Sequence, residues 1–220
     1  MENAVISKGG LTSFHLKVIG IAAMLCDHIG VVFFPELMVL RIIGRISFPI
    51  FAFLLVEGYF HTKSIPKYMS RLLLMALISE VPYDLVMFGR IVDFRRQNVF
   101  FTLFLGILML YLFETRSNAV AKVISLVLVL LVSEAIISDY NSSGLIMILG
   151  FYVYHERPWM RGIANAYINI QAIGGIQSYG TLALIPIGFY NGEQGSGSKK
   201  FFYASYPVLL VILLVIKILI

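Results

Sequence analysis

Long apolar runs alternate with short polar segments along the whole chain. About eight or nine of these runs approach the roughly 19 residues that an α-helix needs to cross a bilayer. They lie near residues 16–34, 42–60, 67–88, 98–113, 119–137, 143–155, 162–176, 179–191 and 203–220. The pattern predicts an all-α fold, a polytopic integral membrane helix bundle with about eight to nine transmembrane or broken helices. We expect residues 1–220 to form a single transmembrane domain, because no segment is long or polar enough for a separate soluble one.

Three of the runs differ from ordinary spans. The runs 143–155 and 179–191 are too short to cross a bilayer without thinning it, and 162–176 is polar, with Asn165 and Asn169 inside it. Membranes tolerate interrupted helices only where protein or water satisfies the backbone. We therefore expect these three runs to be re-entrant or broken helices packed within the bundle.

The composition agrees with a chain that lies in a membrane. Hydrophobic residues make up 59% of it, charged residues 13%, and the mean hydropathy is +0.88. The net charge of +5 comes from lysines and arginines beside the apolar runs, which orient helices, and no basic patch indicates nucleic acid as a partner. A single cysteine, Cys26, excludes an internal disulfide, and the four histidines form no metal-ligand motif, so we expect no metal site.

The distribution of basic residues predicts the orientation. Most of the 17 lysines and arginines fall on segments that lie inside if the N-terminus is cytoplasmic. Arg90, Arg95 and Arg96 are exceptions that crowd one outer segment. Asp84 and Asp93 are close in sequence, which favours local ion pairs, with binding of an external anion as the alternative.

Asp27 and His28 stand side by side within the first apolar run. An ionisable residue near the centre of a membrane helix costs about 2.5 to 3.5 kcal/mol, so such residues are usually functional. A histidine beside a carboxylate fits a general base near neutral pH. A hydrogen-bonded packing histidine and a proton relay remain alternatives.

The predicted topology sorts the other polar residues into two groups. With Asp27 and His28, the outer half of the bundle gathers Arg41, Arg45, Glu80, Asp84, Asn98, Asp139 and Tyr140. The inner end carries a mostly cationic set, formed by Glu57, Tyr59, His61, Lys63, Lys67 and Arg71. Such a set suits a ligand that carries phosphates. For Glu57 and His61, which share a helix face, a solvated cap is the simpler interpretation.

Helical spacing places like charges on shared faces. Arg41 lies above Arg45, and Glu80 lies above Asp84. Like charges in a low-dielectric site need opposite partners, so we expect the arginines to face Asp27 or the pair Glu80 and Asp84. Ion pairs that only hold the bundle together are the competing explanation for these residues.

Short motifs follow one another in a specific order over nearly the whole chain. They include Asp27-His28-Ile29-Gly30, Gly44-Arg45-Ile46-Ser47-Phe48-Pro49, Glu57-Gly58-Tyr59, Ser79-Glu80-Val81-Pro82-Tyr83-Asp84, Gln97-Asn98-Val99-Phe100, Asp139-Tyr140, Tyr190-Asn191-Gly192 and Tyr206-Pro207. This ordered set resembles the TraX family of bacterial membrane proteins. Family members often carry a histidine after the Tyr-Pro pair, whereas Val208 follows it here. If that histidine were essential, this chain would be a divergent or inactive member.

The resemblance implies an acetyl-CoA-dependent N-acetyltransferase in the bacterial cytoplasmic (inner) membrane, with a cytoplasmic N-terminus. Founding members of the family are implicated in acetylating the N-terminus of conjugative pilin. The acetyl group would pass from cytosolic acetyl-CoA to a peptide N-terminus or small amine at the outer side. His28 would act as the base or as an acetyl carrier, and Arg45 or Asn98 would stabilise the oxyanion. Asp27 would orient the imidazole or only pair with Arg45.

The same resemblance assigns the two substrates. Binding of acetyl-CoA falls to His61, Lys63, Lys67 and Arg71, and binding of the acceptor falls to Glu80, Asp84, Asp139 and Tyr140. Two other functions remain open from the sequence. One is a proton-coupled transporter or channel, and the other is a non-catalytic assembly factor for secreted peptides.

Overall fold

The computed structural model describes residues 9–197 and 199–220, and the described chain is helical apart from turns and two isolated β-bridges. The α-helices are α1 (Ser13–Phe33), α2 (Met38–Gly44), α3 (Ser47–His61), α4 (Ile65–Phe88), α5 (Val99–Thr115), α6 (Ala119–Ala135), α7 (Asn141–Val153), α8 (Pro158–Tyr167), α9 (Leu184–Gly188) and α10 (Lys199–Leu219). A π-helix, η1 (Ile168–Ile173), and a 3₁₀-helix, η2 (Gly175–Ala183), lie between α8 and α9. The predicted all-α membrane bundle is confirmed.

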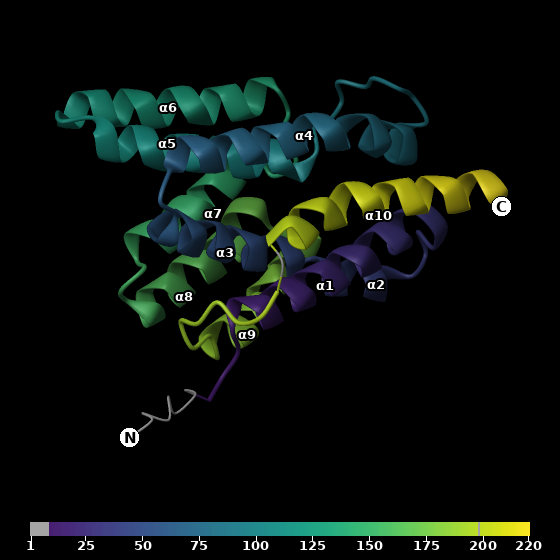
Figure 1. The fold of residues 1–220 in the computed structure, drawn as a ribbon, viewed down its shortest axis with the longest axis horizontal. Coiled ribbons are helices and arrows are strands. Elements are labelled where there is room, and N and C mark those ends of the chain that lie inside the picture. The colour runs from purple at the N-terminus through teal and green to yellow at the C-terminus, as the bar shows by residue number, and fades with distance from the viewer. Residues whose placement is uncertain (1–8, 198) are drawn as a thin grey trace.

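Helix α3 lies at the centre of the bundle and packs against α1, α5 and α7 (Figure 1). Helices α4, α5 and α6 lie side by side, and α10 runs between α4 and α1. Among the described residues, three helical segments are long and apolar enough to cross a membrane: Ser13–Phe33, Met38–His61 and Phe202–Leu219. The share of buried residues is 56% in Met38–His61 and 17% in Phe202–Leu219. Helix α3 therefore packs mainly against protein, whereas α10 exposes most of its surface to lipid.

The predicted long run 42–60 bends where α2 meets α3. The residue four positions after Arg45 is Pro49, which has no N–H to donate to the Arg45 carbonyl. Nε2 of Gln177 donates a hydrogen bond to this carbonyl at 3.3 Å. Gln177 also donates to Oδ1 of Asn169 at 3.0 Å. A buried side-chain amide from a distant segment thus satisfies the free carbonyl at this helix break, which lipid could not do.

The expectation of broken helices is confirmed for two of the three short runs. Run 162–176 passes from α8 into the π-helix η1, and run 179–191 begins in the 3₁₀-helix η2. Asn165 and Asn169 each donate to the carbonyl four residues earlier, at 2.9 Å. Run 143–155 is packed within the bundle as expected, but it is not broken, because α7 is a continuous α-helix. Helix α7 is short because it lies inside the protein, packed on α3 and α5, and need not span lipid.

Candidate functional site

His28 is a buried residue of α1 with one ring nitrogen engaged and the other without a partner. Its Nδ1 lies 2.9 Å from the carbonyl oxygen of Met24. A carbonyl only accepts, so Nδ1 carries the proton and Nε2 presents a lone pair. Nε2 is buried and has no hydrogen-bond partner in the described part of the chain. This is the tautomer that a general base requires.

Asp27 forms ion pairs with the two arginines of α2 and its C-cap. Nη2 of Arg45 donates to Oδ1 of Asp27, and Nε of Arg41 lies 3.4 Å from the same oxygen. Nε of Arg45 also donates to the carbonyl of Arg41 at 3.2 Å. Of the two roles predicted for Asp27, the structure therefore has the pairing with Arg45, and the carbonyl of Met24 orients the imidazole instead.

Gly44 permits this close approach of α1 and α2. A Cβ added at Gly44 would overlap the side chain of Asp27, with no flexible neighbour to move away. We expect Gly44→Ala to lower the free energy of unfolding by about 1 to 3 kcal/mol, because overpacking forces the helices apart. Thermal or denaturant unfolding in detergent measures this. Gly162→Ala is the matched control, since nothing lies within 4 Å of its added Cβ, and an unchanged Gly44→Ala would contradict the prediction.

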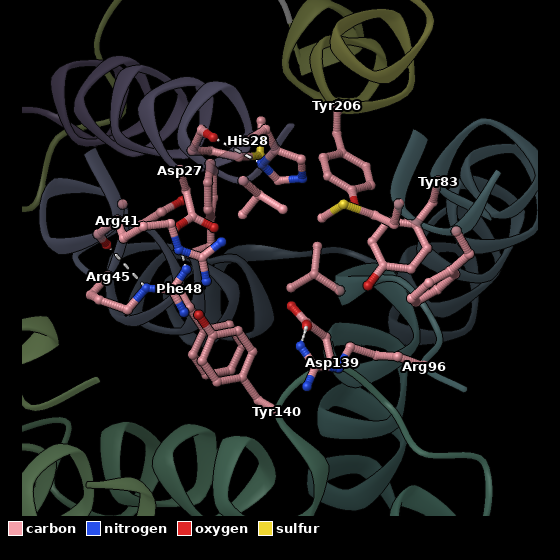
Figure 2. Close-up of a pocket in the computed structure, with 18 of the residues that line it drawn as sticks. Asp27, His28, Arg41, Arg45, Phe48, Tyr83, Arg96, Asp139, Tyr140 and Tyr206 are labelled. Carbon is pink, nitrogen blue, oxygen red and sulfur yellow. Dashed lines mark hydrogen bonds and ion pairs between the residues drawn. The ribbon is translucent and has the colours of Figure 1, made fainter. Parts of the chain in front are cut away.

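A cavity of about 480 Å³ opens beside His28. We call it the His28 cavity. Its polar lining consists of Asp27, His28, Arg41, Arg45, Ser47, Tyr83, Arg95, Arg96, Asp139, Tyr140 and Tyr206. Figure 2 shows side chains from α1, α4, α10 and the segment before α7 converging on one space. Residues far apart in sequence thus form a single polar chamber within an apolar bundle.

Asp139 and Tyr140 lie in the cavity, as the sequence predicts. Oδ1 of Asp139 is 3.7 Å from Nη1 of Arg96, and the ring of Tyr140 stacks on Phe48 with centroids 3.7 Å apart. Two tyrosines that the sequence analysis did not assign to the site, Tyr83 and Tyr206, also line it. The packing of α4 against α10 brings them there. The sequence signals were the motifs that contain them, Ser79–Asp84 and Tyr206-Pro207.

Asn98, Glu80 and Asp84 do not line the His28 cavity. Asn98 is fully buried and caps α5: its Oδ1 accepts from the Phe100 amide at 3.0 Å, and its Nδ2 donates to Ala76 O at 2.8 Å and to Glu80. Its amide groups are committed, so the predicted role of Asn98 as an oxyanion donor is wrong. Glu80 is the partner of Asn98, and Oδ2 of Asp84 accepts from the Asp93 amide at 2.8 Å. The predicted acceptor-binding roles of both acids are also corrected to structural ones.

Asn98 therefore offers a test of stability. We expect Asn98→Ala to cost about 2 to 3 kcal/mol, because it removes a helix cap together with the two buried hydrogen bonds that Nδ2 donates to Ala76 and Glu80. Asn118 caps α6 through the Ala121 amide at 2.8 Å but is exposed, so Asn118→Ala should cost only about 1 kcal/mol. Unfolding of both variants in the same detergent checks the ranking. Equal losses would show that the buried bonds of Asn98 add nothing to the cap.

A second cavity, of about 290 Å³, adjoins the first, and we call it the Arg71 cavity. Arg71 and His61 line it as the sequence predicts, and Lys17, which was not predicted, adds a third basic residue. The two cavities share the side chains that lie between them: Met24, Phe51, Val99 and Tyr206. Lys63, just before α4, and Lys67, in its first turn, are exposed and line neither cavity, so the structure does not bring them together with Arg71 as predicted.

Glu57 was predicted as part of a solvated cap, and this is wrong. It is buried, lines the Arg71 cavity and lies 2.7 Å from Nε2 of His155. Arg161 stacks over Phe53 next to it, with 4.9 Å to the ring centroid. Helix α8 and its preceding turn bring these groups to α3, a contact that spacing within one helix cannot reveal.

A family model and a known relative match most of this chain. The model of the family described as "TraX protein" matches residues 13–217. A protein named "Probable fimbrial assembly protein FimC, serogroup H1" of Dichelobacter nodosus is 30% identical over 231 residues, covering 92% of this chain and 94% of the relative. The uncharacterized protein RP591 of Rickettsia prowazekii (strain Madrid E) is 34% identical over 149 residues, 64% of this chain and 56% of that protein. No solved structure matches significantly.

Proposed function

The chain belongs to the TraX family, and from this membership and its two adjoining cavities we propose that it is an integral membrane acetyltransferase. It moves an acetyl group from cytosolic acetyl-CoA to an amine at the outer side of the bacterial cytoplasmic membrane. The Arg71 cavity faces the cytoplasm and the His28 cavity faces outward in this proposal, with a cytoplasmic N-terminus. The unpartnered Nε2 of His28 is the observation that carries it.

The Arg71 cavity has the chemistry that acetyl-CoA needs. The nucleotide end of acetyl-CoA carries phosphates, and Lys17 and Arg71 supply positive charge there, with His61 beside them in the lining. The pantetheine arm is uncharged, which suits the largely apolar lining of Leu54, Leu55, Leu72, Phe100 and Leu103. An arm that enters from this cavity reaches the boundary formed by Met24, Phe51, Val99 and Tyr206, beyond which lies His28.

The chemistry then runs at His28. The neutral amine of the acceptor attacks the thioester carbonyl carbon, the carbon–sulfur bond breaks, and CoA leaves as its thiolate. Nε2 of His28 takes the proton of the amine and returns it to the thiolate, so the products are an acetamide and CoA. In the two-step route, Nε2 attacks first and carries the acetyl group to the amine. Arg45 lines the cavity and keeps N–H groups beyond those that bind Asp27 and Arg41, so we assign it the oxyanion.

Purified protein with labelled acetyl-CoA and a set of peptides and small amines tests the proposal. We expect release of free CoA thiol together with label on the acceptor, each dependent on protein. Acetyl-CoA should also raise the unfolding temperature, because a ligand of the native state stabilises it. No transfer and no stabilisation by acetyl-CoA would overturn the proposal.

The name of the Dichelobacter nodosus relative favours a fimbrial or pilus subunit as the acceptor, since such subunits present a peptide N-terminus. The same name also fits a non-catalytic assembly factor. The two differ in their need for His28. If assembly of surface fibres in a host strain needs this protein but proceeds unchanged with His28→Ala, the non-catalytic role holds and the enzyme does not.

A further inference from the structure

The His28 cavity holds more guanidinium groups than carboxylates to match them. Its lining contains the basic residues Arg41, Arg45, Arg95 and Arg96 and the acidic residues Asp27 and Asp139. A surplus of positive charge in a partly enclosed space attracts an anion and repels a simple ammonium ion. The excess positive charge therefore affects which amines can enter the His28 cavity.

Two of the four arginines already hold a carboxylate in a close contact. Arg45 donates to Asp27 and to the carbonyl of Arg41. Arg95 holds Asp93 in a two-pronged contact, with Nε and Nη2 at 2.9 Å and 2.8 Å from its two carboxylate oxygens. These hydrogen bonds lower the pKa of Asp93 to about 2, so the pair stays ionised at neutral pH.

Arg41 and Arg96 are incompletely matched. Nε of Arg41 is 3.4 Å from Asp27, and Nη1 of Arg96 is 3.7 Å from Asp139, whereas a charge-assisted hydrogen bond is normally about 2.7 to 2.9 Å long. Asp27 gives its closer contact to Arg45. The Arg96 side chain is 57% exposed, so a ligand that enters the cavity can reach it. Both guanidinium groups have donors available for a second, better-placed anion.

Acetyl-CoA does not supply that anion. In the proposed function its phosphates stay at the Arg71 cavity and only the uncharged arm with its thioester approaches His28. The remaining ligand of the His28 cavity is the acceptor. The same positive field also favours the neutral form of an amine held there, which is the nucleophile.

Building on the proposed acetyl transfer, we infer that the acceptor is an amine that also carries an anionic group, a carboxylate or a phosphate, which Arg41 and Arg96 bind while the amine lies at Nε2 of His28. For a peptide acceptor, this means an acidic residue next to the N-terminal one. Arg41 and Arg96 are then specificity-determining residues, and a neutral acceptor of the same size reacts slowly. A carboxylate and a phosphate share this recognition because both accept forked hydrogen bonds from arginine.

Three peptides that differ only at their second residue test the inference: glutamate, glutamine or phosphoserine. With the wild-type protein we expect kcat/KM to be about 10- to 100-fold higher for the two acidic peptides, the fold-change for one hydrogen bond to a charged group. The ratio of the two acidic peptides tells carboxylate from phosphate. Equal kcat/KM for all three peptides would overturn the inference while leaving the acetyltransferase intact.

Arg96→Gln should remove most of the preference, because it slows the acidic peptides far more than the glutamine peptide. Arg90→Gln is the matched control, because Arg90 lies in the same loop but outside the cavity, and it should keep the wild-type preference. In the double variant Arg96→Gln with Asp139→Asn, the preference for acidic peptides should also be absent. If the double variant restores it, Arg96 acts only by neutralising Asp139, and the inference fails.

A failure of the proposed acetyltransferase function can be told apart from a failure of the anion site. If no peptide is acetylated by any variant, binding of the N-terminally acetylated forms of the three peptides is measured by calorimetry. Tighter binding of the acidic forms that is lost in Arg96→Gln supports the anion site without catalysis. Equal or absent binding overturns it.

Discussion

His28→Ala is expected to lower kcat for acetyl transfer by about 10²- to 10⁴-fold, the usual contribution of a positioned general base. The reason is the single tautomer fixed by Met24: Nδ1 donates to the carbonyl, and only Nε2 is left to accept a proton. Binding of acetyl-CoA should survive, because the Arg71 cavity does not include His28. Initial rates with saturating acetyl-CoA, with its thermal stabilisation of the protein measured alongside, test both statements.

Controls separate loss of chemistry from loss of structure. His15→Ala removes an exposed imidazole from the same helix and should leave kcat unchanged. The acceptor amine is itself protonated at acid pH, so both rates are divided by the fraction of neutral amine. The corrected wild-type rate should still fall at acid pH, where Nε2 is protonated, and the corrected residual rate of His28→Ala should lack this dependence. A His28→Ala protein that binds acetyl-CoA and turns over at the wild-type rate would remove His28 from the mechanism.

The two routes through His28 differ in what happens without an acceptor. A covalent acetyl-histidine releases one CoA per active site before any amine is added, whereas direct transfer releases none. Rapid mixing with acetyl-CoA alone measures this. Either result is compatible with the geometry, because both routes use the lone pair of Nε2.

The sequence predicted the helical fold and drew attention to the residues that line the His28 cavity, because both depend on local patterns. Apolar runs set the helices, and the two adjacent ionisable residues in one of them, Asp27 and His28, lie in the wall of that cavity. Even the contact between His28 and Met24 is local, since a side chain in a helix reaches the carbonyl one turn back. The broken helix near Asn169 was also visible as a polar interruption of an apolar run.

What the sequence could not supply is the rotation of each helix about its axis. Glu80 and Asp84 share a face of α4, but the packing turns that face towards Asn98 and Asp93 and not towards the cavity. Tyr83 is the residue of this segment that reaches the cavity. One residue of difference in helix phase thus exchanges a predicted carboxylate for a tyrosine, and no spacing rule within α4 decides it.

Asp27→Ala is expected to lower the free energy of unfolding by about 3 to 5 kcal/mol, the cost of leaving a buried partner of an ion pair uncompensated. The side chains of Asp27 and Arg45 are only 15% and 13% exposed. Asp139→Ala is the comparison, because its partner Arg96 is 57% exposed and lies at 3.7 Å, and exposed pairs contribute about 0 to 1 kcal/mol. Unfolding of the two variants in detergent gives the ranking, and a loss no larger than that of Asp139→Ala would contradict it.

The double variant Asp27→Leu with Arg45→Met decides why the loss occurs. If the cost comes from an unpaired guanidinium, replacing both partners by apolar residues should recover much of the stability, because two buried charges no longer need solvation. Catalysis should not recover, since Arg45 is also the proposed oxyanion donor.

Asp27→Asn complements this double variant, because an amide oxygen at position 27 can still accept a hydrogen bond from Arg45. Its pH–rate profile should keep the wild-type shape, because Met24 and not Asp27 orients His28. If the acid limb that remains after the same correction for neutral amine is lost in Asp27→Asn, the orienting role returns to Asp27.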